Sequence, residues 1–147
     1  MRHFELSTDI RATPDGVWRA LVDLSAWPEW NRLVPEAAGV VEPGQRLSFQ
    51  IRVSPGTFRP HRPTVLVVEP PDRLVLEASF GARWIIHMVH GFHLIPTQEG
   101  CRLRQTWETS GILVPLLWSR LRAAQASFAE FGEDVGRYVT AAARSSS

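Results

Sequence analysis

Alternation of apolar and polar residues along much of the chain predicts β-strands. Near the N-terminus, Phe4, Leu6, Thr8 and Ile10 alternate with polar neighbours, a period of two that indicates a half-buried strand. Alternation or β-branched runs predict further strands at residues 47–53, 64–69, 74–78, 84–95 and 101–109. Because short Pro- and Gly-containing segments separate several of these strands, we expect an antiparallel meander.

A different period predicts two short helices after the first strand. Thr13 suits an N-cap and Pro14 suits the first helical position. Val17 and Leu21 then repeat at helical spacing. A second short helix is expected at residues 27–33. Trp27 and Trp30 would face the same way on it and form a hydrophobic plug that fixes the two short helices to the sheet.

Residues 112–142 predict one long amphipathic helix. Its apolar stripe consists of Leu117, Leu121, Ala124, Phe128, Phe131 and Val135. About 30 residues at 1.5 Å each span roughly 45 Å, so the helix has to cross the whole sheet. Because a helix is straighter than a strongly bent sheet, the two surfaces cannot touch everywhere, and we expect a cavity between them.

These elements predict an α+β fold: a curved seven-stranded antiparallel sheet around a long C-terminal helix, with two short helices after the first strand. The length of 147 residues suggests one domain. We expect this domain to cover residues 1–144 and residues 145–147 to form a disordered tail.

Five sequence motifs carry a family resemblance over nearly the whole chain. In order they are Ile10–Pro14 leading to Val17-Trp18, Asp23–Asn31, Val68–Leu74, His90–Pro96 and Gly100–Gly111. Their order and spacing resemble the SRPBCC superfamily, also called START-like or helix-grip, and within it the polyketide cyclase/dehydrase and lipid-transport group. The resemblance implies the helix-grip fold and a cavity. It does not imply a reaction, because this fold hosts carriers, cyclases and receptors.

One position departs from the family pattern. Many members carry a glutamate where Trp107 stands, and the adjacent Glu108 falls on the opposite face of the strand. A mechanism that uses an inward carboxylate at this position is therefore not expected here.

Composition narrows the possible partners. All 16 basic residues are Arg, none of them in a run, and the net charge is +1, so we expect no nucleic-acid partner and no lysine Schiff base. Cys101 is the single cysteine, which excludes an intrachain disulfide and fits a cytoplasmic location.

The most continuous apolar stretch, Ile112–Trp118, is too short for a transmembrane helix of about 20 residues. The sequence does not indicate an oligomeric state.

Three histidines in one predicted strand suggest a metal site, which strand geometry disfavours. His87 and His93 share one face, and His90 takes the other. Six residues of strand separate His87 from His93 by roughly 20 Å, whereas zinc ligands converge at about 2 Å from one ion. We expect no metal and no cofactor.

His90 is the main candidate for ligand contact. A neutral imidazole on the concave face can orient a ligand hydroxyl or carbonyl, or shuttle a proton; the alternative is a core histidine satisfied by a backbone group or water. If any residue is catalytic, it is His90. The expected ligand-binding residues are Trp84, Met88, His90, Phe92, Gln105, Trp107, Leu121 and Phe128. We place Trp107 opposite His90, across a short hairpin centred near Gln98.

Three function classes stay open. The favoured one is binding or transport of an apolar or aromatic small molecule, such as a lipid, polyketide or isoprenoid. The second is a cofactor-independent polyketide cyclase or dehydratase that uses the same cavity. The third is a protein-interaction module. The apolar segment Ile112–Trp118 is interpreted as a lid, a contact surface or plain core.

Overall fold

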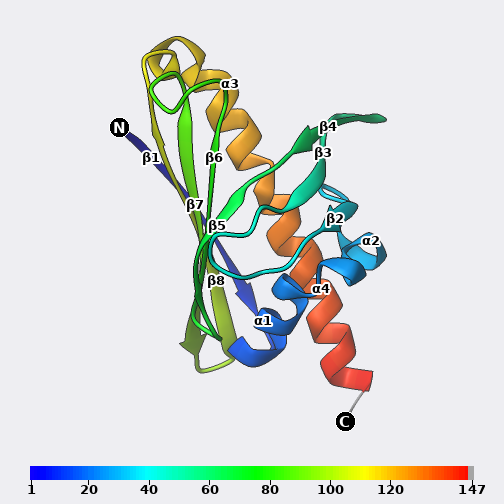
Figure 1. The fold of residues 1–147 in the computed structure, drawn as a ribbon. Helices are drawn as coiled ribbons and strands as arrows, with labels where there is room; N and C mark the ends of the chain where they lie inside the picture. Colours follow the sequence, from blue (N-terminus) through cyan, green and yellow to red (C-terminus); the bar gives the residue numbers. More distant parts are fainter. Residues whose placement is uncertain (146–147) are drawn as a thin grey trace.

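The computed structural model describes residues 1–145, which form two antiparallel sheets, two short N-terminal helices with a 3-10 turn, and a pair of C-terminal helices. The main sheet has five strands in the order β1-β8-β7-β6-β5. Their bounds are β1 Arg2–Ile10, β8 Gly100–Ser110, β7 His87–Thr97, β6 Arg73–Ser79 and β5 Thr64–Glu69. Figure 1 shows this sheet along one side of the molecule, with the C-terminal helices running along it.

Alternation in β1 and β8 positions their side chains as the sequence predicted. In β8 the inward residues are buried and the residues between them are exposed or half-buried. The tight β7–β8 hairpin pairs Thr97 with Gly100, which brings His90 opposite Trp107 as predicted. The turn position therefore determines which side chains meet in the middle of the sheet, seven residues away along each strand.

A second, three-stranded sheet was not predicted as a separate unit. It consists of β2 (Glu36–Ala38), β3 (Ser48–Ser54) and β4 (Thr57–His61), and a single bridge between Arg46 and Thr64 connects it to β5. The described residues thus contain eight strands in two sheets instead of seven in one. β4 was missed because Arg59 and Pro60 interrupt its apolar alternation, and β2 is only three residues long.

The short helices follow the predicted start signal. α1 spans Pro14–Val22, and the backbone N–H of Gly16 donates to Thr13 Oγ1 over 3.2 Å, which confirms the N-cap. A 3-10 turn at Leu24–Ala26 leads into α2, which ends at Trp30, earlier than the predicted residue 33. Asn31 leaves the helical conformation, and its side-chain oxygen accepts from Val34 N over 2.8 Å, which stops the helix.

The C-terminal helix is interrupted once. α3 spans Val114–Ala126 and α4 spans Phe128–Ser145, whereas the sequence predicted one continuous helix. At Ser127 the hydroxyl donates to the carbonyl of Ala124, and Glu130 N bonds to Ser127 O in a tighter i→i+3 pattern. Figure 1 shows the two helices following each other in nearly one line. The tail expected at residues 145–147 lies outside the described residues from 146 onward, and Ser145 is the last residue of α4.

The core lies between α4, the short helices and the two sheets. Phe131 and Val135 of α4 are fully buried. The Phe131 ring lies 5.3 Å from Trp27 and 5.5 Å from Trp30, so both tryptophans pack as the expected plug. α4 approaches β1 closely at Gly132, where a Cβ atom would lie 2.4 Å from the Thr8 hydroxyl. α3 buries only Val114 and Gln125, so it packs less tightly than α4 does.

Candidate ligand-binding site

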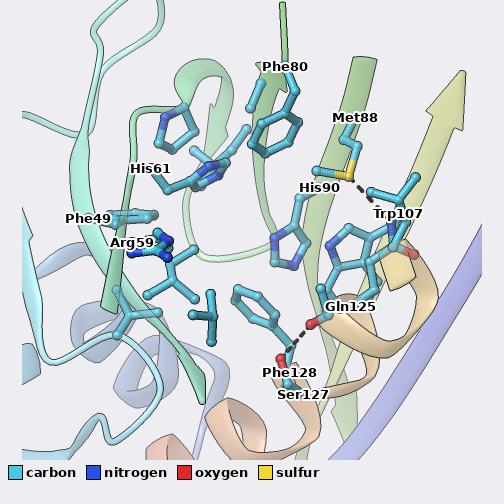
Figure 2. Close-up of a pocket in the computed structure, with 18 of the residues that line it drawn as sticks. Phe49, Arg59, His61, Phe80, Met88, His90, Trp107, Gln125, Ser127 and Phe128 are labelled. Carbon is cyan, nitrogen blue, oxygen red and sulfur yellow. Dashed lines mark hydrogen bonds between the residues drawn. The ribbon is translucent and has the colours of Figure 1, made fainter. Parts of the chain in front are cut away.

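A cavity of about 520 Å³ lies between the two sheets and the junction of α3 and α4. Its apolar lining comes from three directions. The main sheet contributes Leu76, Met88, His90, Phe92 and Trp107; the small sheet contributes Phe49, Ile51 and His61; the helices contribute Leu121, Ala124 and Phe128. Figure 2 shows these walls facing one another across the open space. A volume in the range of 300–1,000 Å³ is typical of small-molecule sites.

His90 lies at the aromatic end of this cavity. Its ring centroid is 4.2 Å from that of Trp107, in a stacked arrangement, and 4.2 Å from that of Phe92. Phe128 from α4 approaches edge-on at 5.0 Å. Burial among these rings lowers the pKa of His90 to about 3, although its hydrogen bond to Gln105 acts in the opposite direction. The imidazole is therefore neutral at physiological pH.

Gln105 forms a hydrogen bond with His90 and is not part of the cavity wall. Its side chain is 1% exposed, and its Oε1 lies 3.2 Å from His90 Nε2. Its amide nitrogen donates to the carbonyl of Phe128 over 3.0 Å. One buried amide thus connects β7, β8 and the first residue of α4. Gln105 is not among the residues that line the cavity, and whether it contacts a ligand stays a prediction.

Six of the eight predicted site residues line the cavity: Met88, His90, Phe92, Trp107, Leu121 and Phe128. Trp84 does not line it, because β7 begins at His87 and the predicted alternation does not extend to residue 84. Trp84 lies in a turn, is 64% exposed, and its carbonyl accepts from Ile112 N over 2.9 Å. Whether the six residues bind a ligand stays a prediction.

The small sheet supplies cavity residues that are absent from the predicted set of ligand-binding residues. Arg59 and His61 of β4 share a face and line the cavity together with Phe49 and Ile51 of β3. Alternation at 47–53 predicted a strand there, but no local signal showed which face would meet the main sheet. Burial lowers the pKa of His61, so the second imidazole of the cavity is also biased towards its neutral form.

Charged groups gather mainly at the cavity margin. Arg59 from β4 and Arg120 from α3 are exposed and line the cavity. Arg52 also lines it but is engaged with Glu130 of α4 in an ion pair. One oxygen of the Glu77 carboxylate accepts a hydrogen bond from His87 Nε2 over 3.0 Å. Most of the lining is therefore apolar, and its charged groups are either exposed, as Arg59 and Arg120 are, or paired, as Arg52 and Glu77 are.

The three histidines of β7 take separate partners. His87 bonds to Glu77 at 3.0 Å, His93 lies 3.4 Å from the Thr106 hydroxyl, and His90 bonds to Gln105. Within residues 1–145, no group of three or more His, Cys, Asp or Glu side chains could hold a metal ion.

The start of α3 is only partly core. Val114 is buried, whereas Ile112 is 67% and Leu116 is 78% exposed. Plain burial therefore does not describe the whole segment Ile112–Trp118. None of the helices in the described part of the chain is both long and apolar enough to cross a membrane.

The fold, cavity and residue pattern can be compared with known proteins. A family model described as polyketide cyclase/dehydrase and lipid transport matches residues 1–142. This chain belongs to that family. Family and fold together support a hydrophobic ligand-binding or cyclase role, and they confirm the resemblance inferred from the sequence motifs.

Several solved structures share this fold at low sequence identity. A protein from Mesorhizobium loti is 24% identical with a TM-score of 0.70, and the match covers 92% of this chain and 95% of that one. A protein from Rhodobacter sphaeroides is 21% identical with a TM-score of 0.75, covering 95% and 93%. The di-domain ARO/CYC StfQ from the steffimycin biosynthetic pathway is 17% identical with a TM-score of 0.75, covering 96% of this chain and 51% of that one. These likenesses show the fold. No curated protein matches the chain.

Proposed function

We propose that this family member binds an apolar or aromatic small molecule in the cavity beneath the α3–α4 junction, and that it carries the molecule without transforming it. The observation that carries this proposal is the lining: an aromatic and aliphatic wall with two imidazoles, whose charged groups are exposed or already paired. Excluding water from such a surface favours an apolar ligand by roughly 25 cal/mol per Å² of apolar area buried.

The state of His90 favours binding over catalysis. A general base works best when its pKa lies near the operating pH, and burial holds the pKa of His90 at about 3. Such an imidazole accepts a hydrogen bond but takes up a proton poorly. Glu77, the carboxylate in the lining, already accepts a hydrogen bond from His87. A cyclase or dehydratase that relies on His90 to move protons is therefore the less supported alternative.

Native mass spectrometry of the purified protein, combined with binding of the fluorescent probe 1-aminoanthracene, tests the proposal. Ala124 lines the cavity, whereas Ala126 lies two residues further along α3, is exposed and does not line it. Ala124→Trp should fill part of the cavity and weaken probe binding by about tenfold or more, equivalent to about 1.4 kcal/mol. Ala126→Trp is the matched control and should bind like the unmodified protein.

A retained apolar molecule released on denaturation, or tight probe binding lost only in Ala124→Trp, would support the proposal. Equal binding by both variants would place the probe elsewhere and contradict it. Turnover of a polyketide-like chain by the purified protein would replace carriage with catalysis.

A further inference from the structure

The hydrogen bonds around Gln105 determine which nitrogen of His90 carries the proton. The carbonyl of Phe128 can only accept, so the group of Gln105 that faces it over 3.0 Å has to be the amide N–H₂. The other end of the same amide, Oε1, therefore faces His90 Nε2 at 3.2 Å. An amide oxygen can only accept, so His90 Nε2 has to be the donor.

This assignment leaves the second nitrogen of His90 as an acceptor. A neutral imidazole carries one proton, so Nδ1 presents a bare lone pair when Nε2 is protonated. Within residues 1–145 no protein group donates to Nδ1, and His90 lines the cavity. Figure 2 shows the His90 ring directed into the open space beside the Trp107 indole.

Trp107 offers the complementary group. Its indole N–H can only donate a hydrogen bond. Within the described part of the chain, no protein group accepts a hydrogen bond from Trp107 Nε1. The ring lines the same cavity and stacks on His90 with centroids 4.2 Å apart. Cross-strand pairing of residues 90 and 107 holds both rings on rigid strands. The apolar end of the cavity therefore carries one unpaired acceptor and one unpaired donor on two stacked rings.

We propose that this end of the cavity selects ligands that carry a hydroxyl group, a phenol or an alcohol, whose O–H donates to His90 Nδ1 and whose oxygen accepts from Trp107 Nε1. The inference rests on the proposed binding function and adds the chemical class of the ligand. A hydroxyl is the smallest group that both donates and accepts. A hydrocarbon would leave both ring groups without a partner in a dry wall, which costs affinity.

The tautomer can be measured without any ligand. Long-range proton–nitrogen correlation spectra of the ¹⁵N-histidine-labelled protein distinguish Nε2–H from Nδ1–H imidazoles. We expect His90 in the Nε2–H form, and a hydroxyl ligand should shift its Nδ1 resonance. An Nδ1–H form would overturn the inference directly.

A matched ligand series tests the selectivity. 2-Naphthol donates and accepts, 2-methoxynaphthalene accepts only, and 2-methylnaphthalene does neither. We expect 2-naphthol to bind about tenfold more tightly than 2-methylnaphthalene, with the methoxy compound in between. His90→Phe keeps an aromatic ring but removes the acceptor, and should reduce the naphthol preference over the methoxy compound to near unity. His93→Phe, on the opposite face of β7 and outside the cavity, is the matched control and should keep the preference.

The outcomes separate the two proposals. If none of the three compounds binds, the proposed binding function fails. If all three bind the unmodified protein with equal affinity, binding stands and the hydroxyl selection is refuted. Because the comparison is made first on the unmodified protein, it holds even if His90→Phe folds poorly.

Discussion

Mild acid should destabilise this protein because the fold holds His90 in a neutral form among aromatic rings. In the unfolded chain the imidazole has its ordinary pKa of 6.5, and in the folded protein burial lowers the pKa to about 3. The unfolded state therefore binds a proton more readily than the folded state between these two values. Stability is fully present above pH 6.5 and is lost progressively as the pH falls towards 3.

The size of the effect follows from the pKa difference. Each pH unit in this window costs about 1.4 kcal/mol for one proton. Between pH 6.5 and about pH 4.5, His90 alone should lower the free energy of unfolding by about 3 kcal/mol. Small domains have about 5–15 kcal/mol in total, so this loss would be visible in any denaturation curve.

Urea denaturation at a series of pH values measures the effect, with His90→Phe as the comparison. His61 and His93 also have pKa values lowered by burial, and the pKa of Glu5 is lowered by its bond to His3, so all three add to the acid loss. These contributions cancel in the difference between the two proteins. The variant should lose about 3 kcal/mol less over the same window. Parallel pH curves for the two proteins would refute the burial of a neutral His90.

Three further predictions concern packing and access. Gly132→Ala should lower the free energy of unfolding by about 1–3 kcal/mol, because the new Cβ would lie 2.4 Å from Thr8 Oγ1 and 3.2 Å from Thr8 Cβ. In Gly136→Ala on the same helix, the new Cβ would meet only Ile10, at 3.4 Å, and the free energy of unfolding should rise by up to about 1 kcal/mol. Equal effects of the two variants in thermal melts would contradict the close approach of Gly132 to Thr8. Asp134→Ala should cost about 1–3 kcal/mol in urea denaturation, because its buried carboxylate accepts from Arg32 N at 3.0 Å and Arg32 Nη2 at 2.8 Å; an unchanged midpoint would show that this link contributes little. Cys101 should react slowly with a thiol reagent at pH 7 until urea unfolds the chain, since burial raises its pKa to about 11, and rapid labelling of the folded protein would show that β8 opens.

Local patterns in the sequence determined much of the fold. The N-cap at Thr13, the alternation in β1 and β8, and the short turn between β7 and β8 all act over a few residues. Once that turn is placed, the period of two carries the register along both strands, which is why Trp107 could be placed opposite His90. Six cavity residues followed from the same periodicity and from the helical stripe that contains Leu121 and Phe128.

Features that depend on partners distant in sequence were decided by the tertiary structure. β4 forms because β3 supplies its hydrogen bonds, which outweighs the weak strand pattern around Arg59 and Pro60. Trp84 leaves the strand because its carbonyl bonds to Ile112, nearly 30 residues away. Gln105 was predicted as a ligand contact because alternation shows only on which face of the sheet a side chain lies, not what packs against it there. The structure shows what alternation could not: the Gln105 side chain bonds to both His90 and the carbonyl of Phe128 at the start of α4.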